Sequence, residues 1–347
     1  MISVSNIKIG DKHFIPVQTM LKNPVWEIDK TLEKIGKLEN IGCDILRITI
    51  PDMQALEGLK EILKVTKIPI VADIHFDYRL AIASVEAGVH KVRINPGNIG
   101  DKNRVRSVID CLKKHGTPVR IGINKGSLPK HLKERYKDPI RVMIESAKEE
   151  VGYFEEAGYN NIVLSFKSST VMQTIAVNRL AHREFDYPLH IGVTEAGDLI
   201  DGTVKNSIGI ATLLQEGIGD TIRVSLTAPE EEEVKVGMKI LEALGMRESR
   251  VEIISCPTCG RTQIELAKLG QQVKALAEGK RFYKNLKIAV MGCVVNGPGE
   301  AGECDFGIAG GKEQSILFKN GEKLKVIKNN CIMPEIEQLL TEYYEKD

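Results

Sequence analysis

The chain has 347 residues, 42% of them hydrophobic and 27% charged, and 48 Lys and Arg against 47 Asp and Glu leave a net charge of +1. This composition is typical of a globular protein with more than one domain. The balanced charge argues against a nucleic-acid or membrane-surface binder, although a local basic cluster is compatible with it. We find no signal peptide and no membrane-length apolar stretch, and therefore expect a cytoplasmic protein. Seven cysteines are too few for a disulfide framework and fit a reducing compartment.

Residues 1–245 are predicted to form a TIM (β/α)8 barrel, because eight β-branched runs alternate with eight amphipathic stretches over a suitable length. The expected strands are Val17–Met20, Ile45–Thr49, Ile70–Asp73, Lys91–Asn95, Val119–Gly122, Ile162–Phe166, Leu189–Val193 and Thr221–Ser225. The expected helices are Ile28–Asn40, Met53–Thr66, Tyr78–Ala87, Lys102–His115, Pro139–Ala157, Val171–Phe185, Val204–Glu216 and Glu230–Leu244. Before them, SNIKIGDKHF predicts two short strands around a Gly10-Asp11 turn, a hairpin suited to plugging the barrel floor.

An open doubly wound sheet is the alternative for this half, since it also alternates strands and helices. Such a sheet usually carries a glycine-rich phosphate loop after its first strand. Here that position reads TMLKNP, which contains no glycine. The barrel is therefore favoured.

Residues 249–347 are predicted to form a second, small α/β domain. Strands are expected at Val251–Ser255, Leu286–Met291, Ser315–Lys319 and Lys323–Ile327, with Asn320-Gly321 as a hairpin turn. Helices are expected at Gln263–Gly279 and Pro334–Glu345. The acidic run Glu230–Glu233, at the end of the barrel, is interpreted only as acids placed favourably at a helix N-terminus.

Four predicted barrel strands share one pattern, an arginine between apolar residues; these are Arg47, Arg93, Arg120 and Arg223. Because strand side chains alternate, apolar flanks facing the helices place each arginine in the lumen. His75 and Lys167 follow other strands and add to the positive character. One mouth of the barrel therefore carries five formal positive charges, from Arg47, Arg93, Arg120, Lys167 and Arg223, and two negative ones, from Asp73 and Glu195.

This excess of buried cations predicts a multiply charged anionic ligand, and phosphate or diphosphate fits the fork of a guanidinium group best. A single arginine would be explained by pairing with a helix carboxylate, but four in one register favour the ligand. Asn95, Asn124 and Ser225 can add neutral hydrogen bonds. Glu195 is the carboxylate best placed for proton transfer, or it serves as an ion-pair partner.

Three cysteines in the second domain form a metal-binding pattern: Cys256 and Cys259 in C-x-x-C, and Cys293 in a glycine-rich loop after the next strand. A redox pair of the thioredoxin type would leave Cys293 unexplained, and structural zinc normally has four closed ligands. Spacing therefore favours an iron–sulfur cluster over zinc. The fourth ligand stays open: softness favours Cys304, and Cys331 is interpreted as core.

The strings CPTCGRT and GCVVNGPGE, with VADIHF, VRINPGN, VLSFKSS and VTEAG, resemble the family of bacterial 4-hydroxy-3-methylbut-2-en-1-yl diphosphate synthases over nearly the whole chain. The resemblance implies an oxidoreductase that opens the ring of 2-C-methyl-D-erythritol 2,4-cyclodiphosphate and removes a hydroxyl, in the non-mevalonate (MEP) route of isoprene biosynthesis. It also implies a [4Fe–4S] cluster that passes two electrons singly, with flavodoxin or ferredoxin as the donor. The second domain would then resemble the iron–sulfur modules of sulfite and nitrite reductases.

The resemblance also implies roles for individual residues. Cys256, Cys259 and Cys293 correspond to thiolate ligands and Glu300 to a carboxylate ligand, which a substrate oxygen could displace because a carboxylate is a hard, exchangeable ligand. Arg47, His75, Arg93, Arg120, Lys167, Arg223 and Ser225 correspond to diphosphate contacts, and Asn124, Asn296 and Glu195 lie near the reacting carbons, with Glu195 as a proton donor. The family further implies a head-to-tail homodimer.

Two other classes of function are less consistent with the sequence. A regulatory or nucleic-acid-binding protein with a cluster or zinc would have no use for an arginine-lined barrel. The balanced charge also disfavours this class. A barrel phosphosugar enzyme with a structural zinc domain fits the residues but lacks the family resemblance. Iron, sulfide and zinc analysis separates these classes.

Overall fold

The computed structural model describes residues 1–124, 126, 128–249, 251–277, 280, 282–295, 299 and 302–345. The chain divides into two compact units, Met1–Arg247 and Glu248–Asp347. Among the helices of the described ranges, none is long and apolar enough to cross a membrane.

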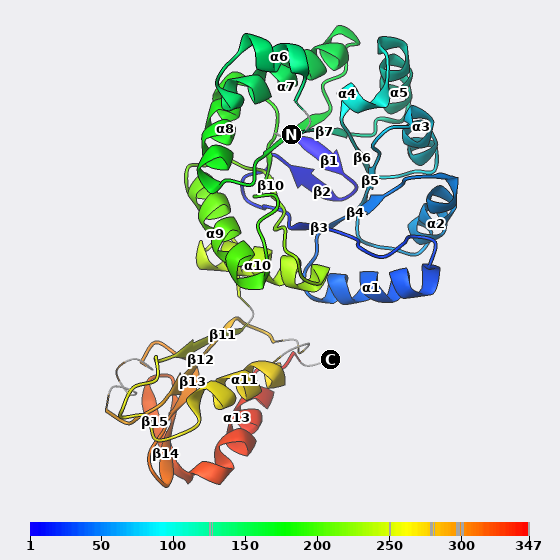
Figure 1. Ribbon diagram of the computed structural model, residues 1–347. Helices are drawn as coiled ribbons and strands as arrows, with labels where there is room; N and C mark the ends of the chain where they lie inside the picture. The colour runs from blue at the N-terminus through cyan, green and yellow to red at the C-terminus, as the bar shows by residue number, and fades with distance from the viewer. Residues whose placement is uncertain are drawn as a thin grey trace. The chain divides into compact units, whose positions relative to one another are not determined.

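The first unit is a closed ring of parallel strands (Figure 1). Six strands pair in sequence order: β3 (Gln18–Met20), β4 (Ile45–Thr49), β5 (Ile70–Asp73), β6 (Lys91–Ile94), β7 (Val119–Asn124) and β8 (Ile162–Lys167). The short strands β9 (His190–Ile191) and β10 (Thr221–Ile222) pair with each other. Parallel bridges from Leu164 to Leu189 and from Val17 to Ile222 close the ring. The predicted (β/α)8 barrel is thereby confirmed, and the open sheet is excluded.

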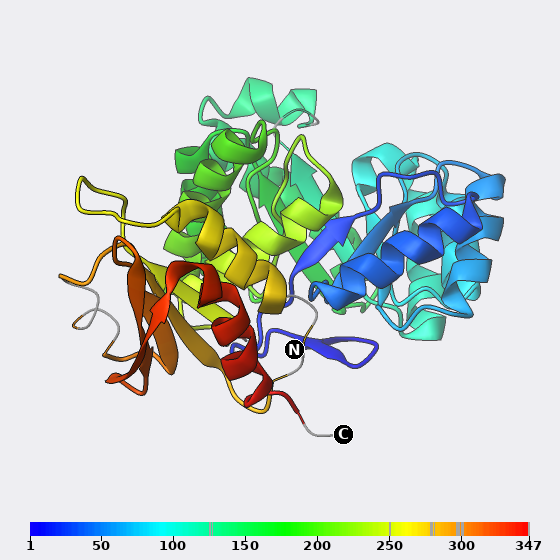
Figure 2. The same ribbon diagram turned by 90° about the horizontal axis from the view of Figure 1, so that it is seen from below.

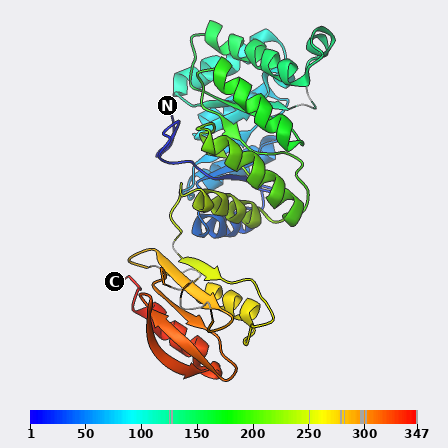
Figure 3. The ribbon, with the colours of Figure 1, turned by 90° about the vertical axis from the view of Figure 1, so that its left-hand side faces the viewer.

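Eight long helices surround the ring (Figure 3): α1 (Ile28–Asn40), α2 (Met53–Leu63), α3 (Tyr78–Glu86), α5 (Lys102–His115), α7 (Pro139–Glu156), α8 (Val171–Glu184), α9 (Leu199–Gln215) and α10 (Glu230–Ala243). Their apolar faces pack on the outward-facing strand residues in one large core. α9 begins five residues before the expected Val204, because the Asp198 carboxylate accepts the backbone N–H groups of Ile200 and Asp201 and starts the helix there. Two short helices, α4 (Pro96–Ile99) and α6 (Lys130–Arg135), were not predicted.

An antiparallel hairpin of β1 (Ile2–Val4) and β2 (Ile7–Ile9) lies across one end of the barrel (Figures 1 and 3). Its buried Ile2, Val4 and Ile9 pack on lumen-facing strand residues, namely Ile45, Val71 and Val163. The expected plug is therefore present. Its expected turn is wrong: the chain reverses at Ser5-Asn6, with φ of 55° at Ser5, because this turn directs the three apolar side chains onto the barrel.

The strand register orders the lumen side chains in layers, each supplied by alternate strands. From the floor upward, the layers are Ile45, Lys91, Val163 and Thr221; then Gln18, Val71, Arg120 and His190; then Arg47, Arg93, Ser165 and Arg223; then Met20, Asp73, Gly122 and Gly192; then Thr49, Asn95, Lys167 and Ser225. The lower layers are apolar only where they meet the hairpin. The cationic residues therefore occupy most of the barrel's depth.

The second unit contains a five-stranded mixed sheet in the order β11-β12-β13-β14-β15. These strands are Val251–Ser255, Leu286–Met291, Phe306–Ala309, Gln314–Lys319 and Glu322–Lys328. Helices α11 (Leu266–Ala277) and α13 (Ile332–Thr341, preceded by a 3-10 turn at Asn329–Cys331) pack side by side against the sheet (Figure 2). The Asn320-Gly321 turn is confirmed, with φ of 49° and 78°. Strand β13 was not predicted, and the expected helix end at Gly279 lies outside the described residues.

Candidate active site

Asp73 is the carboxylate around which the lumen cations are arranged. It ends β5 and is fully buried. Its carboxylate oxygens lie 3.4 Å from Arg47 Nε, 3.1 Å from an Arg93 terminal nitrogen and 3.2 Å from His75 Nε2. Burial alone would raise the pKa of Asp73, but Arg47, His75 and Arg93 hold it well below its usual value. One carboxylate thus fixes three of the predicted cationic groups.

Among the described residues, Arg120 and Lys167 have no such carboxylate partner. Arg120 is 2% exposed, and its Nε and one terminal nitrogen make no hydrogen bond to any described residue. Lys167 is the last residue of β8, and its Nζ also makes no hydrogen bond within the described ranges. Burial, and then the neighbouring positive charges, lower the pKa of both groups. A bound polyanion would reverse that effect, because it stabilises the charged forms.

Two glycines keep the lumen open next to these cations. A Cβ on Gly122 would lie 3.1 Å from Arg93 Nε, and one on Gly192 would lie 2.1 Å from the Arg223 carbonyl oxygen and 3.4 Å from Lys167 Nζ. Any larger side chain would press on the guanidinium group or on the backbone. Both positions lie in the layer just above Arg47, Arg93 and Arg223, where an anion entering from the mouth would meet those groups.

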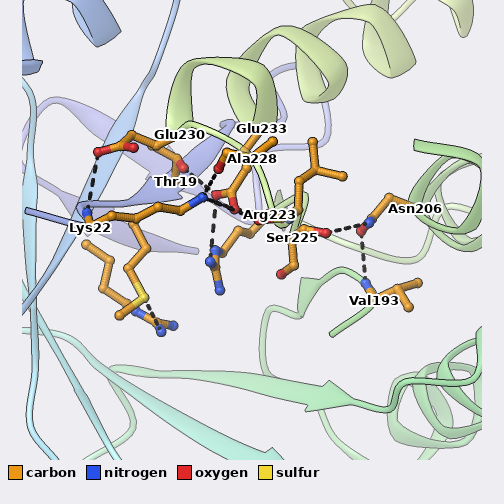
Figure 4. Close-up of polar contacts among 12 residues, drawn as sticks. Thr19, Lys22, Val193, Asn206, Arg223, Ser225, Ala228, Glu230 and Glu233 are labelled. Carbon is orange, nitrogen blue, oxygen red and sulfur yellow. Dashed lines mark hydrogen bonds and ion pairs between the residues drawn. The ribbon is translucent and has the colours of Figure 1, made fainter. Parts of the chain in front are cut away.

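Arg223 has a carboxylate partner on helix α10 (Figure 4). Its guanidinium lies 3.6 Å from Glu233, which is 2% exposed. Glu233 also accepts hydrogen bonds from Thr19 Oγ1 at 2.7 Å and from the backbone N–H of Leu226 at 3.1 Å, and it lies 3.3 Å from Lys22 Nζ. The interpretation of Glu230–Glu233 as merely helix-terminal acids is therefore wrong, because the helix packs two of these acids inward. For Arg223, the alternative interpretation, in which the arginine pairs with a helix carboxylate, is therefore confirmed.

The mouth is hollow beside Arg223. A pocket of about 400 Å³ is lined by residues 20–26, Thr49, Pro51 and Arg223. Residues 20–26 follow β3, and Thr49 ends β4, so the pocket lies at the carboxyl ends of the strands. Barrel enzymes bind their substrates at this end.

The predicted neutral and acidic residues also lie at this end. Asn95 follows β6, and Asn124 and Ser225 lie at or after the ends of β7 and β10. The Ser225 carbonyl accepts a 3.3 Å hydrogen bond from Asn206, while its hydroxyl makes none to any residue described (Figure 4). Glu195, in the loop after β9, is exposed and has φ of 52°. A left-handed glutamate is strained, and such strain concentrates at functional sites.

Hydrogen bonds connect the two cysteine-bearing loops of the second unit. Cys256 directly follows β11, and Cys293 lies two residues after the neighbouring parallel strand β12. Gly292 donates its N–H to Cys256 Sγ at 3.3 Å, and Gln263 donates to the Gly292 carbonyl at 2.9 Å. Hydrogen bonds to Cys259, first from the Arg261 backbone, lower the pKa of this exposed thiol. Lower thiol pKa favours the thiolate that binds metal.

These thiols fit a metal cluster in donor type and in placement at adjacent strand ends. Within the ranges described, no three His, Cys, Asp or Glu side chains are gathered into a metal-holding group. Glu300 and Asn296 lie outside the described residues, so the fourth predicted ligand has no position here. Cys304 is 3% exposed among apolar residues, and burial raises its thiol pKa, which disfavours it as a ligand. Cys331 is exposed, so its interpretation as core is wrong: it is the residue that directly precedes helix α13.

Sequence reasoning missed several lumen and mouth residues. Glu233 lies on a helix and Lys22 in a loop, and only the tertiary fold shows that Glu233 reaches Arg223 and that Lys22 reaches Glu233. Lys91 and His190 alternate with apolar residues on their strands, and this alternation could have identified them as lumen residues, whereas Gln18 is followed by the polar Thr19.

Residues 1–238 match the GcpE TIM-barrel domain, and residues 252–342 match the GcpE protein C-terminal domain. The chain is 49% identical over 336 residues to 4-hydroxy-3-methylbut-2-en-1-yl diphosphate synthase (flavodoxin) of Caldanaerobacter subterraneus, covering 96% of this chain and 94% of that one. It is 50% identical over 336 residues to the enzyme of the same name from Clostridium acetobutylicum, covering 96% of each.

Among solved structures, dihydropteroate synthase of Xanthomonas albilineans matches with a TM-score of 0.50 and 13% identity, covering 67% of this chain and 92% of the other. At that identity the likeness concerns the barrel fold alone. The two domain matches together span nearly the whole chain, and the relatives match it over almost their full length. This chain therefore belongs to the GcpE family, in which these relatives are 4-hydroxy-3-methylbut-2-en-1-yl diphosphate synthases.

Proposed function

We propose that this protein converts 2-C-methyl-D-erythritol 2,4-cyclodiphosphate to (E)-4-hydroxy-3-methylbut-2-enyl diphosphate by reductive ring opening, in isoprenoid biosynthesis, with flavodoxin as the electron donor. The observation that carries the proposal is the cation-lined lumen of a GcpE-family barrel. Arg120 and Lys167 are buried there without a carboxylate partner among the described residues. The names of the relatives supply the product and the donor, and the family resemblance of the sequence supplies the cyclic substrate.

The lumen residues bind and orient the diphosphate. Arg47 and Arg93 are held in place by Asp73, so little side-chain entropy is lost when their remaining donors meet phosphate oxygens. Arg120 and Lys167 supply donors that are not satisfied beforehand. Glu233 plays the same part for Arg223 as Asp73 plays for the other two arginines. Ser225 Oγ completes the set as a neutral donor.

Glu195 is our candidate for protonating the departing hydroxyl, with Asn124 and Asn296 orienting the carbon skeleton. The strained backbone at Glu195 and its exposure at the mouth support this assignment. A hydroxyl leaves readily only when it is protonated, so a positioned carboxylic acid lowers the barrier. Asn95 lies buried in the layer of Lys167 and Ser225, where its amide can bind a phosphate oxygen.

We propose Cys256, Cys259, Cys293 and Glu300 as the residues that hold a [4Fe–4S] cluster. When bound, such a cluster supplies the two electrons of the reaction one at a time. The placement of Cys256 and Cys293 after adjacent strands, and the Gly292 N–H donated to Cys256 sulfur, support this ligand set. The carboxylate of Glu300 would leave one ligand position exchangeable, whereas a fourth thiolate would not.

We further propose a head-to-tail homodimer in the cytoplasm. Helix α9 presents an apolar stripe, Ile200, Val204 and Ile208, which are 75%, 53% and 51% exposed. These residues are spaced four apart and share one helix face, which suits contact with a second copy of the chain. The seven cysteines are all free thiols, which fits a reducing compartment. Size-exclusion chromatography with light scattering tests the dimer, and a monomeric mass would contradict it.

The test of the function uses full-length protein purified without oxygen, reduced flavodoxin and the cyclic diphosphate, with the product followed by mass spectrometry. We expect turnover by the wild-type protein and by Cys331→Ser, which removes an exposed cysteine outside the proposed ligand set. Cys259→Ser, at another exposed cysteine, should lose turnover. Glu300→Ala should still assemble a cluster but fail to turn over. Full activity of either Cys259→Ser or Glu300→Ala would contradict the proposed ligands.

A further inference from the structure

The barrel floor contains a lysine that the proposed diphosphate site does not use. Lys91 is the first residue of β6 and is fully buried. Its neighbours Val92 and Ile94 belong to the outer core, so alternation directs Lys91 into the lumen, as it does Arg93. Lys91 Nζ makes no hydrogen bond to any residue that the structure describes. An amine is therefore buried deep in the barrel, two residues along the strand below Arg93.

The floor below this amine is apolar. Ile45 and Val163 share its layer, and they pack against the buried hairpin residues Ile2, Val4 and Ile9. The hairpin thus closes the end of the barrel away from the mouth (Figure 3). Removing an ammonium group from water without a partner costs several kcal/mol, so this charge needs compensation.

The layer directly above adds more donors. Among the described residues, Arg120 has two unpartnered guanidinium nitrogens and Gln18 has an unpartnered amide. His190 is fully buried; its Nδ1 is paired with Thr221 Oγ1, and its Nε2 has no partner in the same ranges. Burial and then the charge of Arg120 lower the pKa of Lys91. Burial and then the charges of Arg120, Lys167 and Lys91 lower the pKa of His190.

The nearest lumen carboxylate is already engaged. Asp73 lies two layers above the Arg120 layer and contacts Arg47, Arg93 and His75. Glu233, an inward acid of α10, contacts Arg223, Lys22 and Thr19 near the mouth. Within the described residues, neither carboxylate forms an ion pair with Lys91 or Arg120. The positive charge at the floor must therefore be compensated by something other than these side chains.

We propose that the barrel floor binds one small inorganic anion of the chloride class, held by Lys91 Nζ together with the Gln18 amide and with His190 as its Nε2–H tautomer. We choose a small monovalent anion because Ile45, Val163 and Thr221 occupy the other positions of the floor layer. The site is distinct from the diphosphate site, which opens to the mouth. It lies below Arg120 and keeps that guanidinium charged and ordered before substrate enters.

The first test follows thermal unfolding of the full-length, anaerobically purified protein in increasing sodium chloride, with sodium gluconate keeping the ionic strength constant. A ligand that binds only the folded state raises the melting temperature in a saturable way, here by roughly 5 °C. Lys91→Met keeps the length of the side chain but removes its charge, and it should abolish the chloride response. Lys8→Met, on the exposed face of the hairpin at the same end of the barrel, should retain it.

The second test needs no variant and therefore stands even if Lys91→Met does not fold. Crystals of the wild-type protein soaked in sodium bromide should show an anomalous scattering peak within hydrogen-bond distance of Lys91 Nζ. The proposal is overturned if the floor shows no bromide peak, or if wild type and Lys91→Met respond equally to chloride. Greater stability of Lys91→Met with no halide effect in either protein would also overturn it, since that result indicates a neutral amine. Neither test depends on reductase activity. Failure of the anion proposal would therefore leave the proposed reaction unaffected.

Discussion

The carboxylate of Glu233, in the first turn of α10, lies 3.6 Å from the guanidinium of Arg223, which follows β10 in the barrel. A residue from the outer helix layer therefore fixes a cation of the lumen. Glu233 also accepts a hydrogen bond from Thr19 Oγ1 at 2.7 Å, so it links the first and last strands of the ring.

We expect Glu233→Gln to raise the KM for the cyclic diphosphate about tenfold, because removal of the charge frees Arg223 and leaves Lys22 without its carboxylate. The matched control is Glu232→Gln, whose parent carboxylate pairs with Lys235 on the exposed side of the same helix. Steady-state kinetics should show little change in this control. Equal KM values for both variants would contradict the positioning role of Glu233.

Gly122→Ala tests whether the lumen must stay open beside Arg93. The added Cβ would lie 3.1 Å from Arg93 Nε, which forces the guanidinium aside. We expect KM to rise by about three- to tenfold with the fold retained, since a displaced arginine loses part of its contact with phosphate. Gly152→Ala on α7 is the control, because nothing lies within 4 Å of its Cβ. It should leave KM unchanged and stabilise the helix by up to about 1 kcal/mol.

Glu195 combines a proposed proton-donor role with a left-handed backbone, φ of 52°. Glu195→Gln keeps the shape but cannot donate a carboxylic proton, so kcat should fall by about 10²-fold or more. Glu195→Gly should be equally inactive, with a melting temperature equal to or above that of wild type, because glycine relieves the strain. A near-normal kcat in Glu195→Gln would contradict the proton-donor role, and the strained backbone would then need another explanation.

Glu150, on α7, gives a prediction about pH and stability. Its side chain is buried, and burial raises its pKa to about 8, with Arg93 opposing and Glu149 adding to the effect. The folded state then retains a proton that the unfolded state loses near pH 4.5. Stability contributed by this group is therefore full below about pH 4.5 and falls as the pH rises to about 8.

Glu150→Gln removes this titration. Each unit of pKa elevation corresponds to about 1.4 kcal/mol, so the variant should lose less stability than wild type between pH 5 and 8. Urea unfolding at several pH values measures the difference. Parallel pH profiles for the two proteins would contradict the raised pKa.

The barrel was predictable from sequence because strand and helix periods alternate clearly, and several boundaries, such as Ile45–Thr49 and Lys102–His115, match the structure. Strand β13 was not predicted, because Phe306–Ala309 is short and contains a glycine. The outward or inward direction of a helix face depends on tertiary packing, which is why the sequence identified Glu233 only as a helix-terminal acid. Alternation along strands did predict the lumen arginines, since a two-residue period needs no tertiary information.

The cluster site was predictable only in part. The C-x-x-C spacing and Cys293 point to thiolate ligands, and the structure places Cys256 and Cys293 after neighbouring strands. Spacing does not identify a carboxylate ligand, because acids are common and carry no motif of their own. The assignment of Glu300 therefore rests on the family resemblance and remains a prediction.

The central claim is that this chain is an iron–sulfur reductase. Iron, sulfide and zinc analysis of the full-length protein, purified without oxygen, tests it most directly. We predict about four iron and four sulfide per chain, as in a [4Fe–4S] cluster, and no stoichiometric zinc. One equivalent of zinc with no sulfide would contradict the account.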